Sequence, residues 1–124
     1  MDPIKIYKEK FGVVEIYQNY LICIPNSYTN MGIEEALRVI TIGDENFKGS
    51  WAYIGNRKNN SSVDPTLYFQ ADEKAKNVVS MAIVAYSGNM YKFAELEKTF
   101  VPDRIHFRIF TKLDDAIEWT LSFI

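Results

Sequence analysis

The stretch VVSMAIVAY, residues 78–86, decides the fold. Apolar side chains occupy almost every position, so the segment has no polar face to turn toward water. A strand of this kind is typical of the interior of a parallel sheet that is covered by helices on both faces. We therefore predict a central strand over residues 78–86.

A short apolar strand and a weaker helix are predicted just before this segment. The strand spans residues 50–55 and contains Trp51. The helix spans residues 65–76 and places three apolar side chains at a spacing of four: Leu67, Ala71 and Ala75. Pro65 suits its first turn, because proline lacks the N–H that would be unsatisfied there.

A helix and an edge strand are predicted after the central segment. Four apolar residues recur at intervals of three and four, and they define the apolar face of an amphipathic helix that Pro102 stops: Met90, Phe93, Leu96 and Phe100. Apolar and polar side chains then alternate over residues 105–110. Alternation with one polar face predicts a strand at the edge of the sheet.

Both ends of the chain continue the pattern. Residues 4–8, 13–17 and 20–24 read as antiparallel strands separated by short turns. A helix follows, capped by Thr29 or Asn30 and ended by Gly43, with a predicted buried stripe of Ile33, Ala36, Leu37 and Ile40. Residues 111–114 fit a capping box, and the last helix has a predicted buried stripe of Leu113, Ala116, Ile117, Leu121 and Ile124.

This order predicts one α/β domain over residues 1–124. Its mixed sheet would have antiparallel N-terminal strands, followed by alternating helix and strand units with right-handed crossovers. Its 14 basic and 16 acidic residues leave a net charge of −2, which gives no reason to expect a nucleic-acid partner. The single cysteine and the absence of a long apolar run predict a cytoplasmic protein with no membrane span.

The last fifteen residues, FTKLDDAIEWTLSFI, resemble the C-terminal signature of STAS-like (SpoIIAA-like) proteins, which resemble the bacterial anti-sigma-factor antagonists in fold. The order of predicted elements over most of the chain is similar to that group. The resemblance implies a mixed sheet wound with helices as a right-handed superhelix. It also implies a similarity to lipid-carrying domains.

The segment NNSSVDP, residues 59–65, is the candidate regulatory site. In signalling STAS proteins a serine at the start of the second helix is phosphorylated, and the resemblance implies that Ser61 or Ser62 has this role. A helix N-terminus attracts a phosphate through its free amide groups and its dipole. The alternative is that Asp64 caps the helix and that the preceding residues form a surface turn, with Arg57 and Lys58 solvated upstream.

The remaining residues of chemical interest favour structural roles. His106 is the one histidine, so no histidine-based metal site forms, and it is predicted to lie partly exposed on a strand. Cys23 lies within an apolar strand and is predicted to be inert. Neither Asp44-Glu45 nor Asp114-Asp115 is predicted to be catalytic, because each pair suits a helix end. We therefore predict no catalytic residues, no metal and no cofactor.

The function expected from the sequence is that of a non-enzymatic regulatory or protein-interaction module, with a protein partner or a second copy in a homodimer. The alternative is a carrier of a small apolar ligand, held in a cavity between helices and sheet. The abundant aromatic residues bear on this choice. Gathered in a concavity they favour the carrier, and on an exposed patch they favour a partner surface.

Overall fold

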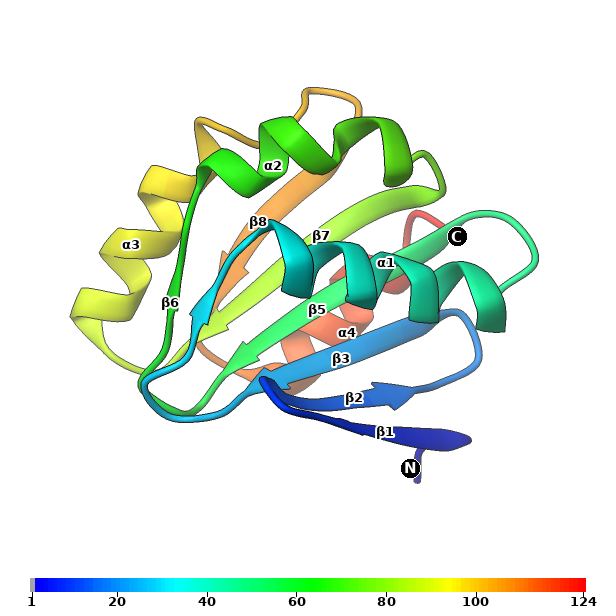
Figure 1. The fold of residues 1–124 in the computed structure, drawn as a ribbon, viewed down its shortest axis with the longest axis horizontal. Helices are drawn as coiled ribbons and strands as arrows, with labels where there is room; N and C mark the ends of the chain where they lie inside the picture. The colour runs from blue at the N-terminus through cyan, green and yellow to red at the C-terminus, as the bar shows by residue number, and fades with distance from the viewer. Residues whose placement is uncertain (1) are drawn as a thin grey trace.

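A six-stranded sheet forms the centre of the computed structural model, which describes residues 2–124 (Figure 1). Met1, the first residue of the predicted domain, lies outside the described residues. The strands lie in the order β1-β2-β3-β5-β7-β8, antiparallel over the first three and parallel over the last four. The prediction of an α/β fold with a mixed sheet is confirmed.

Strand β7, Val78–Ala85, corresponds to the central strand predicted over residues 78–86, and it is internal to the sheet but not at its centre. Hydrogen bonds join it to β5, Trp51–Arg57, on one side and to β8, His106–Phe110, on the other. All of its residues except Val79 are buried. It lies second from one edge, and β8 is the edge strand, as its alternating pattern predicted.

The N-terminal strands form an antiparallel meander. These are β1, Lys5–Glu9, β2, Gly12–Ile16, and β3, Tyr20–Pro25. The first turn requires glycine at position 12, because its φ is +153° and a Cβ there would lie 2.2 Å from the carbonyl oxygen of Ile24. Strand β3 then pairs in parallel with β5 and links the two halves of the sheet.

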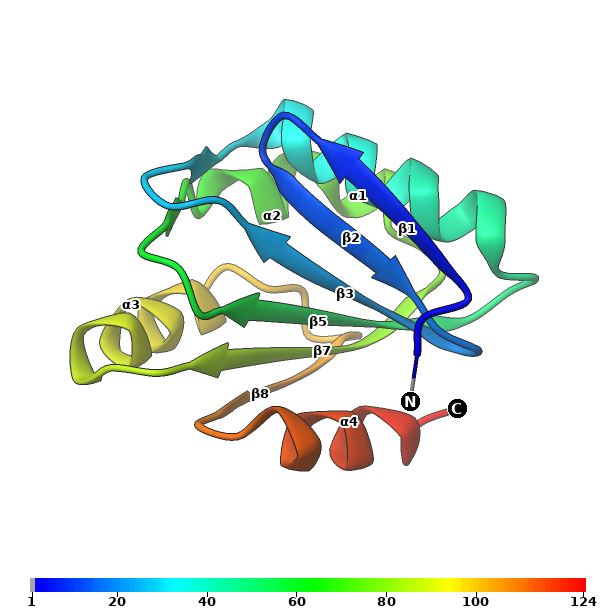
Figure 2. The same ribbon diagram turned by 90° about the horizontal axis from the view of Figure 1, so that it is seen from below.

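Helices cover both faces of the sheet. One face carries α1, Ile33–Asn46, α2, Thr66–Ala71, and α3, Gly88–Lys98, while α4, Leu113–Leu121, packs on the opposite face (Figure 2). A 3₁₀ turn, η1, Asp72–Lys74, extends α2. The core therefore has two clusters, one on each face of the sheet.

Two short strands that the sequence did not predict form a second sheet. Strand β4, Asn30–Met31, pairs in parallel with β6, Ser62–Val63. The pairing joins the loop after β3 to the loop after β5. Both loops lie beyond the carboxyl ends of their strands, so the small sheet holds the entries to α1 and α2 together.

The cap of α1 differs from the prediction. The helix is capped at Gly32, whose N–H donates to Oε1 of Glu35 at 2.8 Å. Thr29 and Asn30 do not cap it, because the chain at Asn30 is already engaged in the β4–β6 ladder.

The predicted end and buried face of α1 were also wrong. Gly43 lies within the helix, which continues to Asn46. Glycine occurs at this position because the ring of Trp51 packs so closely that a Cβ would lie 2.2 Å from Cζ2. Val39 and Ile42 are the fully buried side chains. The predicted stripe lies at the partly exposed margin: Ile33, Ala36, Leu37 and Ile40.

Helix α3 buries a different face from the predicted one. Its buried side chains are Met90, Ala94 and Glu97, and the helix ends at Lys98, before Pro102. The other predicted apolar residues face solvent: Phe93, Leu96 and Phe100. Glu97 on the buried face explains the error, because a prediction from the spacing of apolar residues does not place a charged residue inside.

Helix α4 matches its prediction in position but not in its cap. Lys112 is the N-cap and makes no side-chain capping bond, so the predicted capping box over residues 111–114 is absent. Ala116 and Thr120 are buried, and the other predicted positions are partly or largely exposed: Leu113, Ile117, Leu121 and Ile124.

Candidate functional site

A narrow apolar cavity of about 80 Å³ lies between helices α1 and α2 and the sheet. Its floor follows β5, because side chains at alternate positions of a strand point to the same face: Trp51, Tyr53, Gly55 and Arg57. At about 3.3 Å per residue this floor is about 20 Å long. The cavity is therefore long for its volume, and thin.

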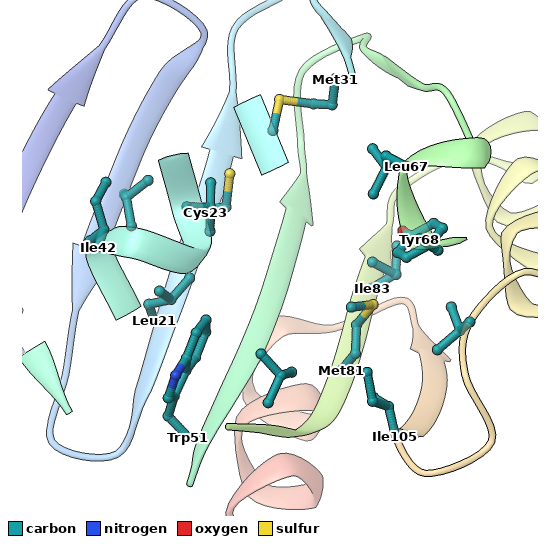
Figure 3. Close-up of a cluster of buried hydrophobic side chains, with 14 of the residues drawn as sticks. Leu21, Cys23, Met31, Ile42, Trp51, Leu67, Tyr68, Met81, Ile83 and Ile105 are labelled. Atoms are coloured by element: carbon teal, nitrogen blue, oxygen red, sulfur yellow. The ribbon is translucent and has the colours of Figure 1, made fainter. Parts of the chain in front are cut away.

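Apolar side chains from three directions enclose this space. Trp51, Met81 and Ile105 project from the sheet side, and Leu67 and Tyr68 come from α2 (Figure 3). Helix α1 closes the remaining wall with Ala36, Val39 and Ile40. The aromatic residues of the sequence thus gather partly in a concavity, which the sequence analysis associated with a carrier.

Small residues keep the cavity open. Gly55 lies in its floor, while Ala36 in α1 and Ala71 in α2 face it from the two helices. An enclosed core cavity costs roughly 24 cal/mol per Å³, so this partly open one corresponds to at most about 2 kcal/mol of stability. Leucine at position 36 or 71 would fill part of the space, so the cavity exists because these side chains are small.

A buried polar network closes the cavity at the carboxyl end of β5. Arg57 and Glu97 form a bidentate ion pair, in which Nη2 donates to Oε1 at 2.6 Å and Nη1 donates to Oε2. The hydroxyl of Tyr68 donates to the same Oε1 at 2.6 Å. Arg57 is 6% exposed and Glu97 is 4% exposed, so water screens this network little.

Charge pairing fixes the protonation of the network. Burial opposes the charge on Arg57, but the hydrogen bonds and charge of Glu97 outweigh burial and raise the pKa of the guanidinium. Burial, followed by the nearby Glu97 carboxylate, raises the pKa of the Tyr68 hydroxyl. Arg57 thus stays charged and Tyr68 stays protonated, and the cavity wall presents no free charge at this end. The network also ties β5, α2 and α3 together.

The structure separates the two candidate serines. Ser61 is 6% exposed, and its hydroxyl has no hydrogen-bond partner within residues 2–124. Ser62 is exposed in β6, and its hydroxyl donates to Oδ1 of Asn30 at 3.0 Å. Of the two, Ser62 is accessible to a modifying enzyme without opening the fold, and phosphorylation at either position stays a prediction.

The start of α2 agrees with the capping alternative only in part, because Pro65 is the N-cap residue and makes no side-chain capping bond. Oδ1 of Asp64 accepts the backbone N–H of Thr66 at 3.1 Å and its hydroxyl at 2.8 Å. The preceding residues form more than a surface turn, because Asn59 donates to the carbonyl of Pro25 and Ser62 pairs with Asn30 across the small sheet. The expectation that Arg57 is solvated was wrong, since Glu97 holds it in the interior.

The other residues singled out in the sequence lie apart from the cavity or carry no reactive group. His106 is exposed on β8 and stacks on Phe123 with ring centroids 4.0 Å apart. Cys23 is fully buried, and burial raises the pKa of its thiol to about 12. Asp44 is a structural acceptor, since its Oδ1 accepts from Nε1 of Trp51 at 3.0 Å. Among residues 2–124, no three metal-binding side chains form a group that could hold an ion.

Sequence reasoning missed the Arg57–Glu97–Tyr68 network. Glu97 falls on the same helical stripe as Met90, Ala94 and Val101, all of which are buried. That spacing was the available signal, since a carboxylate on a buried stripe requires a cation opposite it. The sequence does not indicate which cation pairs with Glu97, because Arg57 lies 40 residues away along the chain.

Comparison with known proteins identifies the fold. No protein-family model matches the chain, and no curated protein matches it. A solved structure with a SpoIIAA-like fold is similar: an uncharacterized protein of the DUF3478 family from Shewanella loihica PV-4, with a TM-score of 0.55 and 13% sequence identity. The match covers 94% of this chain and 90% of that chain. The SpoIIAA-like fold implied by the resemblance is confirmed.

No helix within the described part of the chain is long and apolar enough to cross a membrane.

Proposed function

We propose that this protein is a non-enzymatic binding protein that holds a small apolar molecule in the cavity between α1 and α2. The cavity itself is the observation that carries the proposal. Of the two functions set out from the sequence, a carrier requires a continuous space between helices and sheet, whereas an interaction module requires none. The space found here favours the carrier.

The energetic cost of the cavity supports a function for it. Protein interiors are normally packed with few voids larger than a water molecule. A cavity with apolar walls gains nothing from water, because water needs two to four polar partners to be held. An apolar ligand would restore the missing contacts and the roughly 2 kcal/mol associated with them.

The dimensions of the cavity restrict the ligand. An engineered apolar cavity of about 150 Å³ in another protein binds benzene, so a volume of about 80 Å³ suits a thinner molecule or a short aliphatic segment. The elongated floor along β5 favours an unbranched chain over a fused ring. The ligand is uncharged where it contacts the walls, because the two charged lining residues are already paired, Arg57 with Glu97 and Asp72 with Arg104.

The residues around the cavity support the absence of catalysis. Among the described residues, its lining contains no histidine, serine or cysteine, and the carboxylate of Asp72 is paired with Arg104 at 2.6 Å. Tyr53 and Tyr68 are the hydroxyl-bearing side chains there, and burial raises the pKa of both, which makes them poor nucleophiles and poor bases. We also propose a cytoplasmic location, which the single unpaired cysteine supports.

A regulatory or interaction function remains as a second candidate, because the aromatic residues also gather on the surface. Phe69 is 84% exposed on α2, and Phe93 is 55% exposed on α3. Exposed apolar groups of this size mark interaction surfaces more often than chance.

Thermal unfolding in the presence of small apolar probes tests the carrier. We expect 1-propanol to raise the melting temperature of the wild-type protein, since a ligand at ten times its dissociation constant adds about 1.4 kcal/mol. Leucine at position 71 should abolish the shift by filling the cavity. Equal shifts in the wild-type protein and in Ala71→Leu, or a shift in neither, would contradict the proposal.

A further inference from the structure

Helix α3 presents a stripe of large apolar side chains to solvent. Phe93 is 55% exposed, Leu96 is 64% exposed and Phe100 is 45% exposed. Phe93 and Leu96 lie three residues apart on one side of α3, and Phe100 follows in the turn just beyond the end of the helix at Lys98. The helix buries its neighbouring stripe against the sheet, and no described element covers this one.

Phe69 lies on the neighbouring helix α2 and is a further exposed apolar side chain. Tyr68 points toward α3, because its hydroxyl donates to Glu97. Phe69 is the next residue, about 100° further around α2, and is 84% exposed. Helices α2 and α3 are neighbours on the same face of the sheet (Figure 1). We call Phe69, Phe93, Leu96 and Phe100 the seam patch.

The area of the seam patch is that of an interface core. With about 200 Å² for a large side chain, these exposed fractions amount to roughly 450 Å² per molecule. Two such patches facing each other would bury about 900 Å² of apolar surface. Since about 60% of an interface is apolar, the whole contact would reach roughly 1,500 Å², the standard size for a stable complex.

The order of residues in the stripe is self-complementary. When two copies of α3 cross antiparallel at Leu96, the two Leu96 side chains meet at the axis, and Phe93 of one copy faces the C-terminal turn of the other, which carries Phe100. A two-fold interface requires this correspondence. Antiparallel helices also bring the partly positive N-terminus of each beside the partly negative C-terminus of its partner.

We propose that the seam patch is a homodimer interface, in which α3 packs antiparallel against α3 of a second copy. A lipid surface is the competing occupant of an exposed apolar helix face. The charge of the chain opposes that occupant, because its net charge is −2 and α3 carries two basic residues, Lys92 and Lys98. Helices that bind anionic lipids are rich in lysine and arginine along their polar face. This inference does not depend on the cavity.

Sedimentation equilibrium of the full chain tests the interface. We expect the wild-type protein to be dimeric at about 100 µM, a concentration at which a micromolar complex is saturated. Leu96→Glu should raise the dissociation constant by at least about 100-fold, because it places two carboxylates against each other at the axis. The matched control is Tyr28→Glu, which changes an 88% exposed aromatic residue outside the patch and should leave the dimer intact.

A cross-linking variant tests the geometry without removing apolar surface. In Leu96→Cys the new thiols of two copies meet at the axis and should form an intermolecular disulfide under mild oxidation, whereas Tyr28→Cys should not. Cys23 does not interfere, since it is fully buried. The proposal is overturned by a monomeric wild-type protein, whether or not it binds phosphatidylcholine vesicles. A dimer that survives Leu96→Glu also overturns it.

Discussion

Leucine in place of Ala71 is expected to stabilise the protein. Ala71 is 4% exposed and lines the cavity from α2, so the added carbon atoms would enter space that is already empty. Filling an 80 Å³ cavity recovers up to about 2 kcal/mol at roughly 24 cal/mol per Å³. Small adjustments of the surrounding side chains reduce the gain, so we expect about 1–2 kcal/mol.

The matched control is Ala94→Leu in α3. Ala94 is also a buried helical alanine, at 0% exposed, but it does not line the cavity. The same three carbon atoms must there displace packed neighbours, which typically costs about 1–3 kcal/mol. The two substitutions share their chemistry and their helical context, so their opposite signs isolate the effect of the cavity. Ala36→Leu repeats the test from the α1 wall.

Urea denaturation measures both free energies of unfolding. For a chain of this length each kcal/mol also moves the melting temperature by about 3–5 °C, which gives a second reading. The reasoning is refuted if Ala71→Leu and Ala36→Leu destabilise the protein as much as Ala94→Leu does. That result would mean that α1 and α2 close onto the sheet in solution.

Three further substitutions test other parts of the structure. Glu97→Gln should cost about 3–5 kcal/mol in urea denaturation by leaving the Arg57 charge buried and unpaired, and a loss below about 1 kcal/mol would show that water reaches the pair. Gly43→Ala should destabilise the protein by at least about 1 kcal/mol, because the new methyl group would clash with the Trp51 ring. Helix propensity alone predicts a gain of about 1 kcal/mol, so a more stable variant would contradict the close packing. The free energy of unfolding should fall as pH rises from about 9 toward 12, because the unfolded chain releases the Cys23 proton at a lower pH than the folded chain does. This thiol contributes up to about 1.4 kcal/mol per pH unit, and Cys23→Ala should show a correspondingly shallower slope; equal slopes would mean that the thiol is accessible.

The sequence predicted the fold well because its strands carry simple patterns. Residues 78–85 are apolar on both faces, and only an internal strand buries both. The alternation over residues 105–110 likewise identified the edge strand β8. Such patterns depend on the spacing of apolar residues along one strand, which can be read from the sequence directly.

Helix faces were predicted less well because tertiary partners decide them. In α3 the spacing of Phe93, Leu96 and Phe100 predicted the buried side. The structure buries Glu97 instead, because Arg57 at the end of β5 forms an ion pair with it. In α1 the buried side is set by the ring of Trp51 packing against Gly43. Neither partner is visible in the periodicity of the helix that it orients.

The sequence offered a cavity between helices and sheet only as an alternative, and it gave no means of identifying the residues that line it. Ala36 and Ala71 suit a helix wherever they occur, and nothing in their spacing shows that they face each other across an empty space. A void depends on how far two helices lie apart, and that distance is set by contacts spread over the whole core. The serine pair shows a similar limit, since the burial of Ser61 follows from the small β4–β6 sheet, which has no clear signal in the sequence.

Intermolecular nuclear Overhauser effects test the central claim most directly, because they locate a bound molecule. The measurement uses the wild-type protein with 1-propanol and assigns the side chains that lie close to the alkyl protons. We predict contacts with Trp51, Ala71 and Met81, which line the cavity from three elements. Contacts confined to exposed residues such as Phe69 and Phe93 would contradict the claim that the space between α1 and α2 is a binding site.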